Sequence, residues 1–414
     1  MTTAVMRDYP AKVKVLQIVT RLCIGGVAPY VVSLLRGLDA AYYQQELICG
    51  LEGPGEGSLR PDIEAQGHSP IVVPQLIGNT SLNCSDALAF AQILRLLRRM
   101  RPIIVHTHTT KAGLLGRLGA RLIGVPIVVH TFHGLILKDH YGAAKTRMLR
   151  AVERYLGKLS DRLIAISEDN QKDLLRYRVA AAEKIELIPL GFELDRFISG
   201  NVQRGVLHRE LNLDPAIKLI GIVGRIAPIK NHRLFLDAAV LLFARQATAH
   251  AVVIGDGDLR PEVESYARQL GIADRVSFLG WRHDLPEVYA GLDVVVISSN
   301  NEGTPLSAIE AMAAGRPVVA TKVGGLPDVI SDSKTGYLVE PKNPEQLAFA
   351  IERVLQGGGT ISDLVHNARG AVKDRFNIKR FSSDMNLLYQ RLLAEKGLEH
   401  GAGRPTGQFT NTIV

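Results

Sequence analysis

Short runs of β-branched residues and leucine alternate with helical patterns along most of the chain. This alternation is typical of α/β folds, in which crossover helices connect the strands of a parallel sheet. In the first half, strands are predicted at residues 13–20, 46–51, 71–73, 103–106, 127–130, 162–166 and 185–188. In the second half, they are predicted at residues 218–223, 251–254, 276–279, 293–297, 317–321 and 336–339.

The strand and helix pattern is interrupted over residues 191–214 by a stretch of glycine and charged residues. A second α/β unit begins after it, so a domain boundary is predicted near residues 195–210. The last helical pattern, about 378–396, requires a partner surface for its apolar face. That face carries Phe381, Met385, Leu388, Leu392 and Leu393. The polar residues 401–414 are expected to be flexible.

The composition is that of a globular protein, with 414 residues of which 46% are hydrophobic and 22% charged. This length suits two domains, and the composition excludes a fibrous or disordered chain. No apolar run approaches the roughly 18 residues of a membrane-spanning helix, so we expect the chain to remain in the cytoplasm. Three cysteines without C-x-x-C spacing fit neither a disulfide framework nor a zinc site.

The net charge is +8, and the surplus is concentrated in residues 94–162, where 14 Lys and Arg residues accompany three acidic ones. This indicates an anionic partner for one face of the first domain. Nucleic acid is disfavoured because no stacking aromatic residues are interleaved with the basic ones. We expect peripheral contact with an anionic membrane surface through the helical pattern 143–159. The residues concerned are Arg147, Arg150, Arg154 and Lys158 beside Met148, Val152, Leu156 and Leu159, with Arg95, Arg98, Arg99, Arg101, Lys111, Arg117 and Arg121 in the same domain.

The most informative stretch is residues 298–315, which follow an apolar strand and open a helix. Thr304 is predicted to cap this helix and Pro305 to take its first position. The amides of residues 303–306 would then face outward at the positive helix end, which suits a phosphate. Glu310, eight residues after Glu302, is placed to accept hydrogen bonds from a ribose. Taken alone, the same spacing also fits a capped surface helix.

Arg225 and Lys230 follow the predicted strand 218–223 and precede another helix, with Asn231 as its cap. They lie at the carboxyl edge of the sheet, where open α/β folds bind ligands. Arg225 offers a planar fork to diphosphate oxygens and Lys230 a point charge. Taken alone, the two residues could equally be solvated side chains at a strand end. Together with the stretch 298–315, they indicate a shared phosphate-binding site.

Several segments resemble the donor domain of family 4 glycosyltransferases. They are Gly224-Arg225 with Lys230, VVIGDGDLR (252–260), VSFLGW (276–281), residues 292–321 and GGLPDVI (324–330). Gly25-Gly26, VHTFHG (129–134), IAISE (164–168) and IPLGFELDRF (188–197) resemble the acceptor domain and hinge of the same family. The resemblance implies the GT-B architecture, in which two Rossmann-like domains face each other across a cleft. It implies an acceptor-side domain at 1–198, a donor domain at 199–376, a helix at 377–397 that crosses back to the first domain, and a tail at 398–414.

The same resemblance implies retaining transfer of a sugar, from a nucleotide donor that is UDP-linked, to a lipid-linked or polysaccharide acceptor in cell-surface glycan synthesis. The residues it makes catalytic are Glu302 beside the transferred sugar, His133 at the reaction centre, and Arg225 and Lys230 on the diphosphate, with His130 as the alternative to His133. Those it assigns to donor binding are also Gly25, Gly26, Gly303, Thr304, Pro305, Leu306 and Glu310, with Arg282 as a candidate base contact.

Two positions depart from the family pattern. Val27, Ala28 and Pro29 stand where an acidic-basic pair commonly follows the double glycine, so the contacts of that pair are not carried over. Phe192 and Glu193 stand where the hinge motif commonly has an aliphatic residue and Asp.

No metal or cofactor is expected. Asp256-Gly257-Asp258 has the form of a metal-binding acid pair, but it lies in a glycine-rich turn. Cations and aligned amides would stabilise the leaving phosphate instead. Two alternative functions remain: a nucleotide-sugar epimerase of the same shape, and a non-catalytic nucleotide-sugar-binding subunit. The complete segment from Glu302 to Glu310 argues against the first, and the retention of Arg225 and Lys230 argues against the second.

Overall fold

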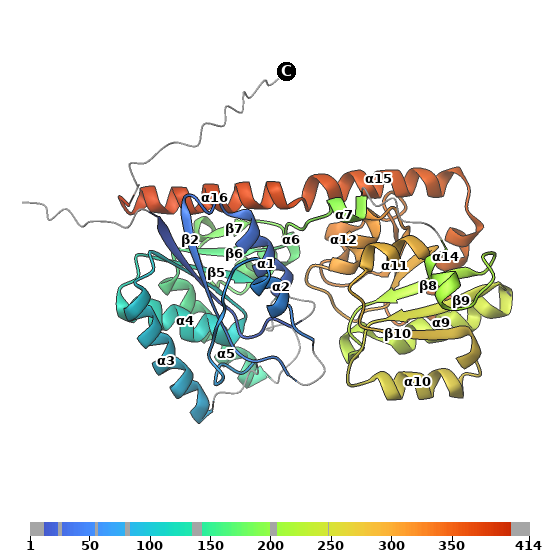
Figure 1. The fold of residues 1–414 in the computed structure, drawn as a ribbon, viewed down its shortest axis with the longest axis horizontal. Coiled ribbons are helices and arrows are strands. Elements are labelled where there is room, and N and C mark those ends of the chain that lie inside the picture. Colours follow the sequence, from blue (N-terminus) through green and yellow to red (C-terminus); the bar gives the residue numbers. More distant parts are fainter. Residues whose placement is uncertain are drawn as a thin grey trace, which may run out of the picture.

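The computed structural model describes residues 12–23, 27–53, 57–78, 83–134, 143–198, 205–246 and 248–398. They form two parallel sheets, each flanked by helices (Figure 1). The first sheet has the order β3-β2-β1-β4-β5-β6-β7 and the second the order β10-β9-β8-β11-β12-β13. Both are doubly wound, as predicted, and every predicted strand is present.

The strands of the first sheet are β1 (Val13–Ile18), β2 (Tyr43–Cys49), β3 (Ile71–Val72), β4 (Ile104–His108), β5 (Ile127–Phe132), β6 (Arg162–Ala165) and β7 (Ile185–Leu187). Those of the second are β8 (Lys218–Val223), β9 (Ala249–Ile254), β10 (Val276–Gly280), β11 (Val294–Ile297), β12 (Val318–Thr321) and β13 (Tyr337–Val339). Strand β2 begins before its apolar run because its polar residues Gln44 and Gln45 still pair in register with β1. Hydrophobicity alone could not show that pairing.

The helices before the second sheet are α1 (Ala28–Gly37), α2 (Arg60–Glu64), α3 (Cys84–Met100), α4 (Thr110–Ile123), α5 (Ala143–Leu159), α6 (Glu168–Arg176), η1 (Ala182–Lys184), α7 (Asp195–Ile198) and α8 (Val206–Glu210). Those that follow are η2 (Pro228–Lys230), α9 (His232–Arg245), α10 (Arg260–Gln269), η3 (Ala273–Arg275), α11 (Leu285–Gly291), α12 (Leu306–Ala313), α13 (Leu326–Val329), α14 (Pro344–Gln356), α15 (Gly359–Arg375) and α16 (Ile378–Glu395). Because helices cover both faces of the first sheet, every position of β5 is buried.

Helix α16 crosses back from the second sheet to pack on the first domain, along one edge of the molecule (Figure 1). Its predicted apolar face is fully used, since Phe381, Met385, Leu388, Leu392 and Leu393 are all buried. Helix α1 supplies part of the partner surface that the sequence required.

The two connections between the domains are hydrogen-bonded to each other. The Phe192 N–H donates to the Phe376 carbonyl at 2.8 Å, and the Ile378 N–H donates to the Phe192 carbonyl at 3.1 Å. Gly191 is required at this crossing because a Cβ there would lie 2.1 Å from the Cβ of Phe381. Glu193, the unusual residue of the hinge motif, forms an ion pair with Arg36 of α1 at 2.6 Å.

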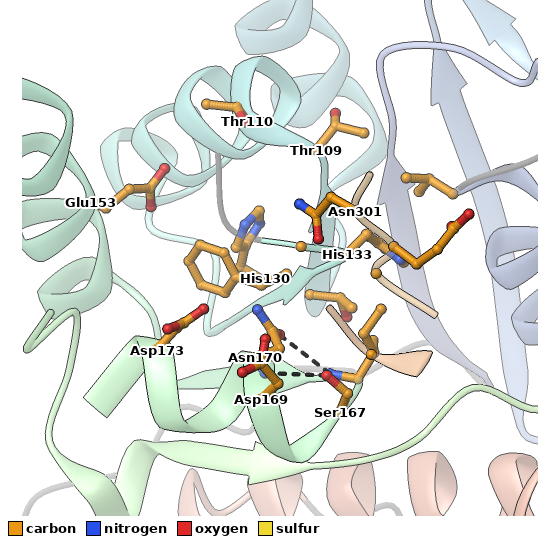
Figure 2. A pocket seen from close by; sticks show the side chains of 18 of the residues that line it. Thr109, Thr110, His130, His133, Glu153, Ser167, Asp169, Asn170, Asp173 and Asn301 are labelled. Atoms are coloured by element: carbon orange, nitrogen blue, oxygen red, sulfur yellow. Dashed lines mark hydrogen bonds between the residues drawn. The ribbon is translucent and has the colours of Figure 1, made fainter. Parts of the chain in front are cut away.

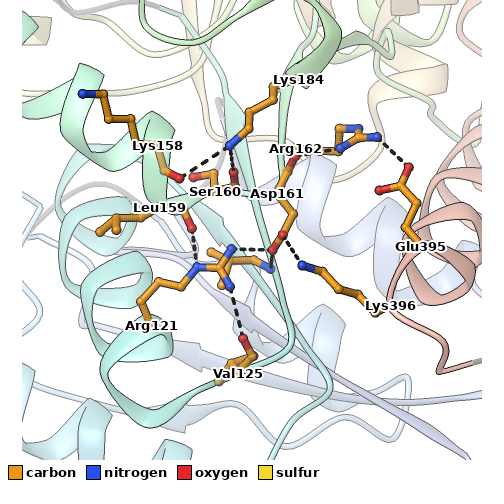
Figure 3. A network of polar contacts seen from close by, with 11 residues as sticks. Arg121, Val125, Lys158, Leu159, Ser160, Asp161, Arg162, Lys184, Glu395 and Lys396 are labelled. Carbon is orange, nitrogen blue, oxygen red and sulfur yellow. Dashed lines mark hydrogen bonds and ion pairs between the residues drawn. The ribbon is translucent and has the colours of Figure 1, made fainter.

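The basic surplus of the first domain is partly internal, which corrects the expectation that it forms one exposed face. Lys111 pairs with Asp86 at 2.8 Å and Arg117 with Glu153 at 2.8 Å, and both basic side chains are almost fully buried. Arg121 pairs with Asp161 at 2.6 Å. Figure 3 shows that Asp161 also binds Lys396, just beyond α16, at 2.9 Å. These charges hold helices together and are not available to an anionic partner.

Candidate functional site

A cavity of about 320 Å³ lies between the two domains, at the carboxyl ends of their parallel strands (Figure 2). This is where ligands bind in open α/β folds. The first domain contributes the ends of β5 and β6 with α5 and α6, and the second contributes the loop after β11. Asp169 and Asp328 connect the domains beside the cavity, through a 3.3 Å hydrogen bond from the Asp169 N–H to the Asp328 carboxylate.

Glu302 and Lys230 form an ion pair on the donor side. The Lys230 ammonium lies 2.6 Å from Glu302 Oε1, and the Glu302 side chain is only 9% exposed. The Ser299 hydroxyl donates to the same oxygen at 2.5 Å. The ion pair with Glu302 balances the charge of Lys230 in the absence of a ligand. The Lys230 ammonium can also bind a diphosphate that enters the cleft.

Gly303 brings the two domains into close approach. A Cβ at this position would lie 2.7 Å from the carbonyl oxygen of His133. Any side chain here would force the loop after β11 away from the first domain. The structure thus places Glu302, Gly303 and His133 around one cavity, as the sequence predicted for the transferred sugar, although their roles there remain a prediction.

Glu310 is a buried carboxyl group on α12, 6% exposed. The Tyr289 hydroxyl of α11 donates to its Oε2 at 2.9 Å. Burial raises the pKa of Glu310 from 4.5 to about 7, while the Tyr289 hydrogen bond opposes that shift. Glu310 is not among the residues that line the cavity, and its role in binding a ribose remains a prediction.

Helix α12 begins one residue later than predicted. Pro305 is its N-cap and Leu306 its first residue, and no side chain caps it. Thr304 therefore does not cap the helix, and within the described residues its buried hydroxyl has no hydrogen-bond partner. Because Pro305 has no N–H, the outward amides at this end belong to the residues on either side of it.

His133 is half-buried, lines the cavity and lies against the buried imidazole of His108. Its Nε2 lies 3.2 Å from His108 Nδ1, and His108 Nε2 lies 2.8 Å from Gln17. His106 bridges Thr131 and Tyr389 of α16, at 2.7 Å each. Burial lowers the pKa of His133 to about 3, so this ring is neutral at physiological pH.

His106 and His108 were not predicted from the sequence. The available signal was their spacing in His106-Thr107-His108, because alternate residues of a strand point to the same face. His130, the alternative to His133, is bonded to the Thr107 hydroxyl at 2.8 Å and also lines the cavity. Three residues of α6 that line the cavity were missed as well: Asp169, Asn170 and Asp173. The four-residue spacing of Asp169 and Asp173, which puts them on one face of the helix, was the available signal for those two.

Other predicted residues are not brought to the cavity. Arg282 uses its guanidinium in ion pairs with Glu210 at 2.5 Å and Asp284 at 2.6 Å. Arg225 is exposed at the end of β8. Gly25 and Gly26 lie outside the described residues. Asp256 of the D-G-D turn pairs with Arg260 at 2.9 Å, and the described residues hold no cluster of three His, Cys, Asp or Glu side chains suited to a metal.

Comparisons with known proteins agree with this architecture. A family model described as Glycosyltransferase Family 4 matches residues 24–196, and one described as Glycosyl transferases group 1 matches residues 217–357. The UDP-Gal:alpha-D-GlcNAc-diphosphoundecaprenol alpha-1,3-galactosyltransferase of Escherichia coli is 27% identical over 394 residues, which are 94% of this chain and 100% of that protein. A D-inositol 3-phosphate glycosyltransferase of Actinosynnema mirum is 34% identical over 300 residues, 68% of this chain and 71% of that protein.

Solved structures share the fold at lower identity. Anabaena HepE, crystallised in complex with UDP, has a TM-score of 0.77 and 21% identity, and the match covers 91% of this chain and 100% of that one. WaaG, a glycosyltransferase involved in lipopolysaccharide biosynthesis, has a TM-score of 0.72 and 18% identity, with 90% and 99% covered. The likeness spans both domains, so it concerns their arrangement across the cleft as well as each sheet.

Proposed function

This chain belongs to the family 4 glycosyltransferases, with the GT-B fold, and from that premise we propose that it moves a sugar from a UDP-sugar to a lipid-linked or polysaccharide acceptor, with retention of configuration and without a metal. The observation that carries the proposal is the cavity in which Glu302 and Gly303 of one domain meet His133 of the other. The E. coli relative, named for a UDP-sugar donor and a diphosphoundecaprenol acceptor, supports both substrate classes.

In this reaction the protein must stabilise the negative charge that develops on the leaving diphosphate. When the bond from the anomeric carbon to the diphosphate breaks and the bond to the acceptor hydroxyl forms, negative charge grows on the departing diphosphate. Lys230 and the positive end of α12 supply a cation and amides for it, and Arg225, exposed at the end of β8, is the second cation that the sequence predicts. Neutral His133 places an uncharged ring beside the sugar, so it adds no second cation to the reaction centre. Glu302, held by Lys230 and Ser299, offers a carboxylate to the sugar hydroxyls.

The alternatives lack such support. The relatives compared above are named as transferases, which disfavours a nucleotide-sugar epimerase. A non-catalytic binding subunit is disfavoured for the same reason, since these relatives are named as enzymes.

A donor screen tests the proposal. Purified protein is incubated with UDP- and GDP-sugars, and bound nucleotide and slow hydrolysis are measured by mass spectrometry. We expect UDP-sugars to be bound and hydrolysed. Lys230→Ala should lower hydrolysis about 100-fold, because losing a group that stabilises transition-state charge costs on the order of 3 kcal/mol. Lys322→Ala, which removes a lysine not placed at the site, is the matched control. Hydrolysis unchanged in Lys230→Ala would refute this site.

We further propose that α5 contacts an anionic membrane. Met148 and Tyr155 are 58% and 56% exposed, and Arg147, Arg154 and Lys158 are exposed on the same helix. Their spacing places them on one stripe, with apolar and basic groups side by side as interfacial helices have them. Val152 and Leu156, part of the apolar stripe expected from the sequence, instead pack inward. No helix of the described part of the chain is long and apolar enough to cross a bilayer.

A further inference from the structure

A line of hydrogen-bonded side chains crosses the first sheet and ends at the cavity. It begins at Gln17 of β1, continues through His108 at the end of β4, and ends at His133, just after β5. These three strands are neighbours in the sheet, in the order β1-β4-β5. Gln17 and His108 are fully buried and do not line the cavity, whereas His133 does (Figure 2). Gln17 and His108 can therefore influence a ligand in the cavity only through His133.

The hydrogen bonds along this line have a direction. His108 Nε2 lies 2.8 Å from Gln17 Oε1. An amide oxygen can only accept, so the proton of this bond is on His108 Nε2. A neutral imidazole carries a proton on one nitrogen alone, which leaves His108 Nδ1 as an acceptor. Because His108 Nδ1 lies 3.2 Å from His133 Nε2, His133 must donate the proton of the second bond.

Both imidazoles are neutral in this environment. Burial lowers the pKa of His108 well below its ordinary value, and the His106 ring, whose centroid is 4.3 Å away, lowers it further. Burial also lowers the pKa of His133 to about 3. A neutral His133 with its proton on Nε2 has a lone pair on Nδ1. Since Nε2 is bound to His108, Nδ1 is the ring nitrogen that is left for a ligand in the cavity.

Packing holds the two rings in the orientation that this line requires. Tyr30 of α1 makes T-shaped contacts with both, and its ring centroid lies 4.8 Å from that of His133 and 5.4 Å from that of His108. Tyr30 is itself fully buried and packs against Phe381 of α16. Because this packing opposes rotation of either imidazole, the orientation of the Gln17 amide decides which nitrogen of each ring carries the proton.

We propose that Gln17 and His108 are positioning residues, which hold His133 in the tautomer with its proton on Nε2 and its lone pair on Nδ1. The inference rests on the proposed function for the place of His133 at the reaction centre, and it adds the residues that set the state of that ring. A substrate group that faces His133 Nδ1 must then be a hydrogen-bond donor. A sugar hydroxyl meets this requirement, whereas a fully ionised phosphate has no proton to donate.

The tautomer can be measured without any substrate, from the nitrogen chemical shifts of protein that contains isotope-labelled histidine. The His133 signals are assigned by their loss in His133→Asn. We expect wild-type His133 at neutral pH to carry its proton on Nε2 and none on Nδ1. A proton on Nδ1 would overturn the inference, because Gln17 would then donate to His108 through its amide nitrogen or His133 would be charged.

Two substitutions of His108 separate its hydrogen bond from its packing. His108→Asn keeps an acceptor oxygen near the place of Nδ1. His108→Leu keeps no acceptor but is closer to histidine in volume, so packing alone would favour it. We expect His108→Asn to keep the His133 tautomer and to hydrolyse UDP-sugars near the wild-type rate. In His108→Leu, His133 should populate both tautomers, and kcat for hydrolysis should fall about tenfold, as for the loss of one hydrogen bond.

His250→Leu is the matched control, because it removes a buried histidine of β9 that contacts Ser277 at 2.9 Å and does not line the cavity. It should leave the His133 tautomer and the hydrolysis rate unchanged. Equal hydrolysis in His108→Asn and His108→Leu, or an unchanged His133 tautomer in His108→Leu, would overturn the inference.

A second variant serves if His108→Leu does not fold. Gln17→Met removes the amide that gives the line its direction, so it should show the same mixed tautomers and slower hydrolysis, and an unchanged tautomer there would equally refute the proposal. Failure of the proposed function would appear separately, as a wild type that hydrolyses no UDP-sugar, whereas the nitrogen spectrum would still report the tautomer of His133.

Discussion

At the scale of single residues, Glu310, the predicted ribose-binding residue, makes the stability of the fold depend on pH. Its carboxyl group is buried, and burial raises its pKa from 4.5 to about 7. Between these values the folded state holds a proton that the unfolded state releases. Stability from this group is thus present at low pH and is lost as pH rises toward 7.

Glu310→Gln should therefore be more stable than wild type at pH 8, and the difference should shrink as pH falls toward 4.5. The same variant should bind UDP-glucose about tenfold more weakly at pH 8, because an amide accepts fewer ribose hydroxyls than a carboxylate. Thermal unfolding across this pH range and calorimetric titration measure the two effects. UDP-glucose is used as the ligand in place of UDP because it has no terminal phosphate that ionises near pH 6. If Glu310→Gln were less stable than wild type at pH 8, the raised pKa assigned to Glu310 would be contradicted.

The positions of the predicted donor-side residues could be foreseen from the sequence better than those of the first-domain residues that line the cavity. Lys230, Glu302 and Glu310 follow strand ends in a recognisable order, so topology alone brings them to one edge. Lys111 and Arg117 were misjudged because their partners, Asp86 and Glu153, are distant in sequence and an ion pair leaves no local pattern. Asn170 could not be recognised at all, since only the packed structure shows that its amide lacks a partner.

At the scale of elements, α16 joins the two domains through a polar contact as well as its apolar face. Tyr389 is fully buried and its hydroxyl lies 2.7 Å from His106 Nδ1. The helical spacing of apolar residues predicted the apolar face of α16. It could not predict the hydrogen bond of Tyr389, because the partner His106 lies on β4, far away in the sequence.

Tyr389→Phe should lower the free energy of unfolding by about 1 to 3 kcal/mol, because it leaves a buried imidazole nitrogen without a partner. Urea unfolding followed by circular dichroism measures the change. Tyr155→Phe, at a site that is 56% exposed, is the matched control and should have almost no effect. Equal stability of both variants would show that the His106 contact contributes nothing.

Helix α5 gives the second test at this scale. Arg147→Ala/Arg154→Ala should reduce sedimentation with anionic vesicles at low salt, since each basic residue near such a surface contributes about 1 kcal/mol. Arg233→Ala/Arg245→Ala removes two exposed arginines from the other domain and should sediment like wild type. Arg150 is left unchanged because its guanidinium stacks 4.1 Å from the Tyr177 ring. Equal sedimentation of the two double variants would exclude α5 as the membrane contact.

At the scale of the whole molecule, the fold follows closely from sequence pattern. Parallel strands buried on both faces give near-continuous apolar runs, and these were all found. The closeness of the domains was not predictable, since it depends on Gly303 meeting the His133 carbonyl and on Asp169 meeting Asp328. Those contacts turn two separate strand edges into one cavity, so the proposed reaction would require both domains together.

The most direct test of the account is a single-turnover transfer from UDP-galactose and UDP-glucose to an alkyl diphosphate-linked N-acetylglucosamine in excess EDTA, with the product's anomeric configuration read by NMR. We predict product formation at an unchanged rate without metal, because Lys230, Arg225 and the start of α12 compensate the leaving charge. We also predict an α-linkage from the α-configured donor, because the proposed transfer retains the anomeric configuration. A β-linked product, or a rate that collapses in EDTA and returns with magnesium or manganese, would contradict it.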